Sequence, residues 1–188
     1  MLSACATPSP EPTSLTPTTT RLADPASVEA DRLFATPQQC EVILAGHAVS
    51  ITFPGAWSTN AAIGGSVGIS ACLWFGPDDL IIPDPLTQAP EGVAISLGSV
   101  GGPAASQHEW ISREETTIAG RPAWRVEESV PSPTDAANET LQLVYWVSLG
   151  AASADGPTLV ARTATEEAGN YALNKAVLDR MMASLAIS

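Results

Sequence analysis

Lysine, histidine and long apolar runs are scarce in this chain of 188 residues. Lys175 is the only lysine, and eight basic residues stand against 20 acidic ones, for a formal net charge of −12. Proteins that bind nucleic acid displace counterions with clustered Lys and Arg, so this composition excludes that class of partner. No run of about 18 apolar residues is present to span a membrane as a helix. Neither His47 nor His108 belongs to a His-x-His or Glu-x-x-His pattern, which are spacings typical of metal ligands. We therefore expect no transition-metal site and no cofactor.

Cysteine is also rare, and the first of the three cysteines follows a recognisable pattern. Leu2-Ser3-Ala4-Cys5 matches a bacterial lipobox, in which the cysteine becomes the acylated N-terminus. We interpret residues 1–5 as the remnant of a lipoprotein signal peptide, whose basic and apolar segments would lie before Met1. The alternative is a chance match in a leader rich in small residues. Residues 6–24 are rich in Pro, Thr and Ser, which predicts a disordered tether.

The remaining cysteines form a pair. If Cys5 carries a lipid, then Cys40 and Cys72 are left, and an oxidising envelope compartment favours joining them. We therefore predict a Cys40–Cys72 disulfide. Two buried free thiols are the alternative, since a free cysteine behaves as a small apolar side chain.

Periodicity along residues 25–188 predicts a single domain that begins and ends with a helix. Asp24 and Pro25 are typical of a helix start, so a short helix is expected over residues 25–35. Alternating apolar residues then predict a series of strands. These are expected near residues 49–53, 67–75 and 92–99, in a hairpin over 109–130 with its turn at Ala119-Gly120-Arg121-Pro122, and near 141–149 and 158–164. Helical spacing returns from Tyr171 to Leu185.

These elements predict an α+β fold. Several strands carry apolar residues on both faces, and such a sheet must be covered on both faces. We expect a twisted antiparallel sheet of about six or seven strands, sandwiched between the N-terminal helix and the C-terminal helix in an α/β/α arrangement.

Three local patterns resemble the PsbP-like family of small domains, which includes many bacterial lipoproteins. They are Ser50-Ile51-Thr52-Phe53-Pro54 with Trp57, the hairpin segment from Thr117 to Trp124, and the terminal segment from Val177 to Leu185. Their order suits that family across about residues 45–186. The resemblance implies a non-enzymatic accessory or docking domain, and it supplies no catalytic residue. One departure concerns charge: photosynthetic members are thought to dock through basic surface residues, whereas this chain is acidic.

One motif offers a catalytic alternative. Gly64-Gly65-Ser66-Val67-Gly68 fits the G-x-S-x-G pattern of a serine hydrolase, in which the serine sits on a turn between a strand and a helix. His108 and an acid such as Asp179 would have to complete the site. A strand rather than a helix is expected after Ser66, so a glycine-rich loop is the simpler interpretation, and we expect no enzyme.

A further alternative is a protein that binds calcium weakly or binds a small ligand. Asp78, Asp79 and Asp84 share one loop, and Glu114, Glu115, Glu127 and Glu128 lie on the predicted hairpin, so oxygen ligands for weak calcium binding could converge. Strand alternation opposes this, because it points Glu114 and Glu115 to opposite faces. A small-ligand site would need a concave apolar pocket with a few polar groups.

The five tryptophans are mostly expected in the core. Trp57 and Trp110 lie at strand margins and are expected to be partly exposed, as a possible interaction surface. The function expected from the sequence is therefore a lipid-anchored, extracytoplasmic accessory or binding domain without catalytic activity. Its expected contacts are a protein or envelope partner and, through Cys5, a membrane.

Overall fold

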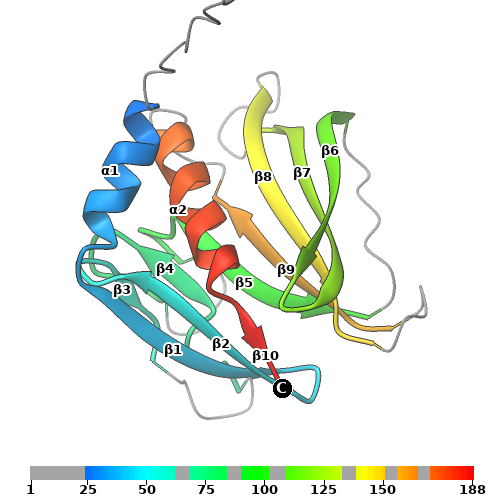
Figure 1. Ribbon diagram of the computed structural model, residues 1–188. Helices are drawn as coiled ribbons and strands as arrows, with labels where there is room; N and C mark the ends of the chain where they lie inside the picture. Colours follow the sequence, from blue (N-terminus) through cyan, green and yellow to red (C-terminus); the bar gives the residue numbers. More distant parts are fainter. Residues whose placement is uncertain are drawn as a thin grey trace, which may run out of the picture.

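The computed structural model describes residues 24–61, 68–83, 90–101, 109–132, 139–150, 156–164 and 170–188. Figure 1 shows two helices, α1 (Pro25–Leu33) and α2 (Tyr171–Ala183), packed beside strongly twisted sheets. The strands are β1 (Pro37–Leu44), β2 (His47–Pro54), β3 (Ser58–Thr59), β4 (Trp74–Gly76), β5 (Ile95–Val100), β6 (Glu109–Ile118), β7 (Arg121–Pro131), β8 (Glu139–Ser148), β9 (Thr158–Thr163) and β10 (Ala186–Ile187). No described helix combines the length and the apolar character needed to cross a bilayer.

The α+β fold class is confirmed. Seven strands form one antiparallel sheet in the order β3-β4-β5-β9-β8-β7-β6. The predicted hairpin is present as β6 and β7, and Ala119 and Gly120 both take positive φ at its turn. Two-residue turns of this kind match the twist of the strands that they connect.

A second sheet was not expected. β1 and β2 pair along their whole length, and β2 also pairs with β10 at the C-terminus, so these three strands form a separate sheet. The sequence predicted no strand over 37–44, because only Val42 and Leu44 of this edge strand are buried and its apolar alternation is short. The hairpin turns at Ala45 and Gly46, which both have positive φ.

The strand expected over 67–75 begins outside the described residues, and from residue 68 onward it is reduced to β4. Cys72 takes a left-handed backbone with φ of 65°, which interrupts an extended chain. The Asn60 side chain holds this bend: its Oδ1 accepts hydrogen bonds from the backbone N–H groups of Leu73 and Trp74, at 2.8 and 2.9 Å. The side-chain amide of Asn60 therefore supplies the hydrogen-bond acceptor that a neighbouring strand would otherwise supply. Apolar alternation in the sequence does not reveal such a contact.

The helices differ from the expected sandwich in one respect: they lie side by side rather than on opposite faces of the sheet (Figure 1). α2 contacts β8 and β9 of the large sheet and β2 of the small one. The main core lies among these elements, with Ile51, Leu143, Leu159, Leu178 and Met181 almost fully buried. The inner face of the large sheet therefore packs against α2 and the small sheet.

The Cys40–Cys72 disulfide is present, with a Cα–Cα distance of 6.0 Å. Cys40 belongs to β1 of the small sheet, whereas Cys72 precedes β4 of the large one. The bond therefore joins the two sheets covalently across 32 residues of sequence.

Candidate functional site

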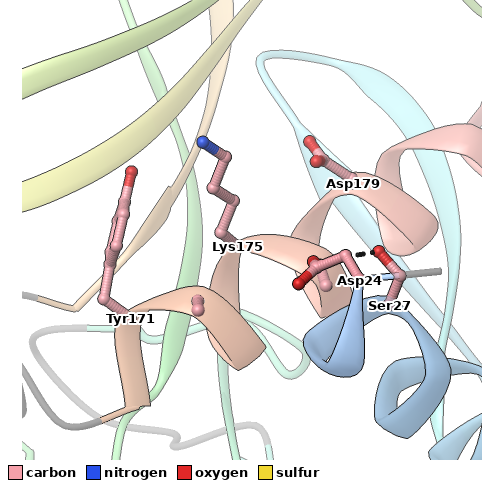
Figure 2. Close-up of a pocket in the computed structure, with 7 residues that line it drawn as sticks. Asp24, Ser27, Tyr171, Lys175 and Asp179 are labelled. Atoms are coloured by element: carbon pink, nitrogen blue, oxygen red, sulfur yellow. Dashed lines mark hydrogen bonds between the residues drawn. The ribbon is translucent and has the colours of Figure 1, made fainter. Parts of the chain in front are cut away.

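Helix α2 presents one polar stripe toward the large sheet. Tyr171, Lys175 and Asp179 are spaced four residues apart, so they lie one above the other on a single helix face. Figure 2 shows these three side chains in successive turns of the helix. Opposite them, Arg125 and Glu127 occupy alternate positions of β7 and therefore share one face of the strand.

The first half of this network is an ion pair with two hydrogen bonds. Arg125 Nε and Nη2 donate to the two carboxylate oxygens of Asp179, each at 2.9 Å. The Tyr145 hydroxyl, on the neighbouring β8, donates to Asp179 Oδ1 at 2.6 Å and accepts from Arg125 Nε at 3.1 Å. The Arg125 side chain is only 20% exposed. Two-pronged arginine–carboxylate contacts of this kind fix orientation as well as distance.

The second half is centred on Glu127. Lys175 Nζ donates to Glu127 Oε2 at 2.6 Å, and the Tyr171 hydroxyl donates to Oε1 at 2.7 Å. Both carboxylate oxygens are thus occupied by groups from α2. The only lysine of the chain therefore forms an ion pair that connects α2 to β7.

These contacts shift several pKa values. The hydrogen bond to Asp179 raises the pKa of Arg125 above its ordinary value. Burial raises the pKa of Tyr145, and the hydrogen bond to Asp179 adds to that rise; for Tyr171, burial and the bond to Glu127 act in the same way. Burial opposes ionisation of Glu127, but the hydrogen bonds from Lys175 and Tyr171 outweigh it, so the pKa of this carboxyl is lowered. The network therefore holds two ion pairs and two neutral phenols.

A cleft of about 240 Å³ lies between the start of α1 and this stripe (Figure 2). Its lining includes Asp24, which precedes α1, and Ser27 of α1, whose hydroxyl donates to Asp24 Oδ2 at 3.3 Å; Tyr171, Lys175 and Asp179 lie on the α2 side. Lys175 and Asp179 are already paired with β7, and the cleft is smaller than the roughly 300 Å³ at which ligand pockets begin. The cleft does not provide the unpaired, convergent groups that a small ligand needs.

The chemistry of the network is structural. A general base or nucleophile needs an available lone pair near its operating pH, whereas both phenols are held protonated and both carboxylates are paired with cations. Arg180 also pairs with Asp31, and this contact links α2 to α1. We conclude that the network positions α1 and α2 against the sheet.

The opposite face of the large sheet carries a different cluster. Val126, Val144 and Trp146 are buried there, with Trp124 and Val160 packed against them. Arg113 of β6 lies between two indole rings, with its guanidinium carbon 4.4 Å from the Trp110 ring centroid and 3.5 Å from that of Trp124. We call Trp110, Arg113 and Trp124 the tryptophan–arginine stack. Its outer member, Trp110, is 42% exposed.

The sequence expectation for Trp110 and Trp57 was half right. Trp110 is exposed as expected, whereas the prediction that Trp57 is exposed was wrong, since only 5% of it is accessible. The backbone N–H of Trp57 donates to the backbone oxygen of Pro54 at 3.0 Å. This turn brings the indole back into the main core. A Phe-Pro-Gly segment ends a strand, but the direction of the chain after it depends on tertiary packing.

The other predicted site residues are dispersed or lie outside the described part of the chain. Cys5 of the lipobox and both Ser66 and His108 of the hydrolase alternative are outside it, and Asp179 is paired with Arg125 rather than with a histidine. Asp84 is outside it as well. Among the described residues, no group of three or more possible metal ligands converges, because Glu114 and Glu115 point to opposite faces and Glu127 pairs with Lys175.

Sequence reasoning missed the polar network. A signal was present: Arg125 and Glu127 alternate on one strand face, and Tyr171, Lys175 and Asp179 recur every fourth residue in a helix. Polar faces of a hairpin and a terminal helix are each expected to meet water. Only their mutual contact, across 44 to 54 residues of sequence, turns them into a partly buried interface.

Comparison with known proteins adds a likeness of fold. No family model matches the chain, and no curated protein matches it. The solution structure of cyanobacterial PsbP (CyanoP) from Synechocystis sp. PCC 6803 is similar, with a TM-score of 0.46 and 15% identity over 82% of this chain and 94% of that one. The crystal structure of LpqN, involved in cell envelope biogenesis of Mycobacterium tuberculosis, gives a TM-score of 0.42 and 13% identity over 85% and 96% of the two chains. The PsbP-like resemblance expected from the sequence thus recurs in solved structures, and similarity at this level indicates nothing about what the protein does.

Proposed function

We propose that this protein is an extracytoplasmic binding domain without catalytic activity, held at a membrane by a lipid on Cys5. In this proposal, residues 6–24 form a spacer between the lipid and the folded domain. A Pro- and Thr-rich chain of that length keeps a domain at a distance from the bilayer surface without ordering it. The partner would be a protein or another component of the cell envelope.

The observation that carries the proposal is the Cys40–Cys72 disulfide. Structural disulfides persist in oxidising compartments and are rare where glutathione and thioredoxin keep thiols reduced. This bond is well placed to be structural, because it joins the two sheets. In the loop-closure description, a crosslink across 32 residues stabilises a fold by about 3.5 kcal/mol.

The absence of catalytic activity is supported by the polar groups. Within the residues that the structure describes, the carboxylates of the helix–sheet interface are paired with cations, and its tyrosines are donors to those carboxylates. Such an arrangement stabilises one relative position of helix and sheet. It offers no group that would exchange a proton with a substrate.

The test separates compartment from anchor. In the native host, fractionation is expected to place the protein with membranes, and labelled palmitate is expected to enter it. Cys5→Ala should abolish both, whereas Ser9→Ala in the tether serves as a matched control and should change neither. Mass spectrometry after alkylation of the intact protein is expected to find Cys40 and Cys72 protected. Free thiols at both positions in protein taken from cells would contradict the extracytoplasmic assignment.

A further inference from the structure

Strand β6 is the exposed edge of the large sheet. It is ten residues long, its first seven residues are all exposed, and β7 is its only strand neighbour in the described part of the chain. One side of β6 therefore carries backbone N–H and C=O groups that no described strand pairs with, and such an edge can accept an added strand. The opposite edge of the same sheet, β3, has only two residues.

Three of the four charged side chains of β6 are acidic, and the fourth is Arg113. Glu114 lies opposite Arg125 in the register and Glu115 opposite Trp124, so the two carboxylates project from the two faces of β6. Glu109 stands at the start of the strand. None of the three forms an ion pair with a described residue, because Arg125 is taken by Asp179 and Arg113 by the two indoles.

Apolar surface adjoins these carboxylates. Trp110 and Ile111 are 42% and 56% exposed, at the point where a bulge shifts the register of β6 against β7. Bulges and charges are common means of keeping an edge strand from pairing with other chains. Two neighbouring exposed apolar residues favour pairing instead, because covering them with a partner lowers the free energy of the complex.

We propose that β6 binds an extended, basic segment of a partner protein as an added strand. Two adjacent basic residues of that segment would pair with Glu114 on one face and Glu115 on the other, and an apolar residue would cover Trp110 and Ile111. Charge complementarity selects this occupant: a second copy of this chain would bring the same acidic edge and a net charge of −12 against it. The proposal names the partner chemistry for the binding role proposed above and rests on that role.

The test uses the full-length protein and a synthetic peptide. The probe is a fluorescent peptide of about ten residues that alternates threonine and valine around two adjacent lysines, a pattern suited to an exposed edge strand. One control peptide replaces the lysines with glutamates, and another carries a central proline, which removes a backbone donor. Fluorescence anisotropy is expected to show binding of the first peptide only, and amide hydrogen exchange is expected to slow within residues 109–118.

A charge-reversal pair locates the site. Glu114→Lys with Glu115→Lys is expected to weaken binding by about tenfold at low salt, because each change replaces an attractive cross-strand charge pair with a repulsive one. Glu41→Lys with Glu91→Lys makes the same change in net charge on two other exposed residues, one of them on the edge strand β1, and should leave affinity nearly unchanged. Equal loss in both variants would overturn the proposal, as would protection outside β6 or equal binding of all three peptides.

Two further outcomes are decisive. Concentration-dependent self-association with protection of β6 would replace the basic partner with a second copy. If the peptide binds as expected but the protein proves to be cytoplasmic, the compartment assignment fails while the edge-strand site stands.

Discussion

The two faces of the large sheet handle arginine in opposite ways. On the inner face, Arg125 is neutralised by the carboxylate of Asp179, which α2 delivers from 54 residues away. On the outer face, Arg113 forms no ion pair with a carboxylate of the described residues and lies between the indole rings of Trp110 and Trp124. The inner arrangement links separate elements, whereas the outer one joins only β6 and its neighbour β7. The difference indicates that the inner face maintains the fold and the outer edge is available for contact.

The largest expected effect on the inner face occurs at high pH. Tyr145 and Tyr171 are the only tyrosines of the chain, and both have pKa values raised above the ordinary 10.0. Because the folded pKa is the higher one, their stabilisation is complete below pH 10 and is lost as the pH rises from there toward the folded pKa values. Ultraviolet absorbance should therefore show tyrosinate forming only together with unfolding. Ionisation near pH 10 with circular dichroism unchanged would contradict the described network.

Removing one ion-pair partner comes next. Asp179→Ala leaves the Arg125 guanidinium and the Tyr145 hydroxyl without their acceptor at a partly buried interface. We expect a loss of about 2 kcal/mol in the free energy of unfolding, below the 3–5 kcal/mol of fully buried pairs, because Asp179 itself is partly exposed. Asp31→Ala removes the exposed contact of α1 with Arg180 and should cost less than about 0.5 kcal/mol. Urea denaturation measures both, and equal losses would show that the network has no special weight.

The length of the apolar pattern in each element decides which parts of the fold the sequence predicts. β8 was predictable because Leu143, Tyr145 and Val147 alternate with Val144 and Trp146 in an unbroken run. α2 was predictable from its apolar spacing. The second sheet was not, since β10 has only two residues and no pattern of its own.

The site is harder to predict than the fold for a related reason. A polar strand face is equally compatible with water and with a polar helix. The sequence positions of Arg125 and Glu127 therefore did not predict that these side chains contact α2. The Asn60 contacts that bend the chain before β4, and the turn that buries Trp57, likewise depend on neighbours distant in sequence. Trp110 was identified correctly because an edge strand has few neighbours to alter its surroundings.

A smaller effect is expected at low pH. The pKa of Glu127 is lowered from 4.5, so its stabilisation is present above that pH and is lost as the pH falls through the folded value. Lys175→Met removes the cation that lowers this pKa and should cost about 1 kcal/mol at neutral pH, while reducing the loss of stability on acidification. Arg32→Met removes an exposed pair with Glu29 within α1 and serves as the control; it should change the acid transition much less than Lys175→Met, because solvent screens the exposed pair. An identical acid transition in Lys175→Met and the native protein would contradict the assignment.

The smallest effect is expected on the outer face and sharpens the contrast most directly. Arg113→Ala removes a cation between two indoles, and exposed contacts of this type contribute about 0.5–1 kcal/mol, well below the expected loss for Asp179→Ala. Trp110 would lose its neighbour, so a red shift of tryptophan emission is expected with little change in unfolding. Arg162→Ala is the matched control: this arginine lies on the same face, opposite Val144, and donates to Ser96 Oγ at 3.3 Å. A loss for Arg113→Ala as large as that for Asp179→Ala would mean that the outer stack also maintains the fold, and the distinction between the two faces would no longer hold.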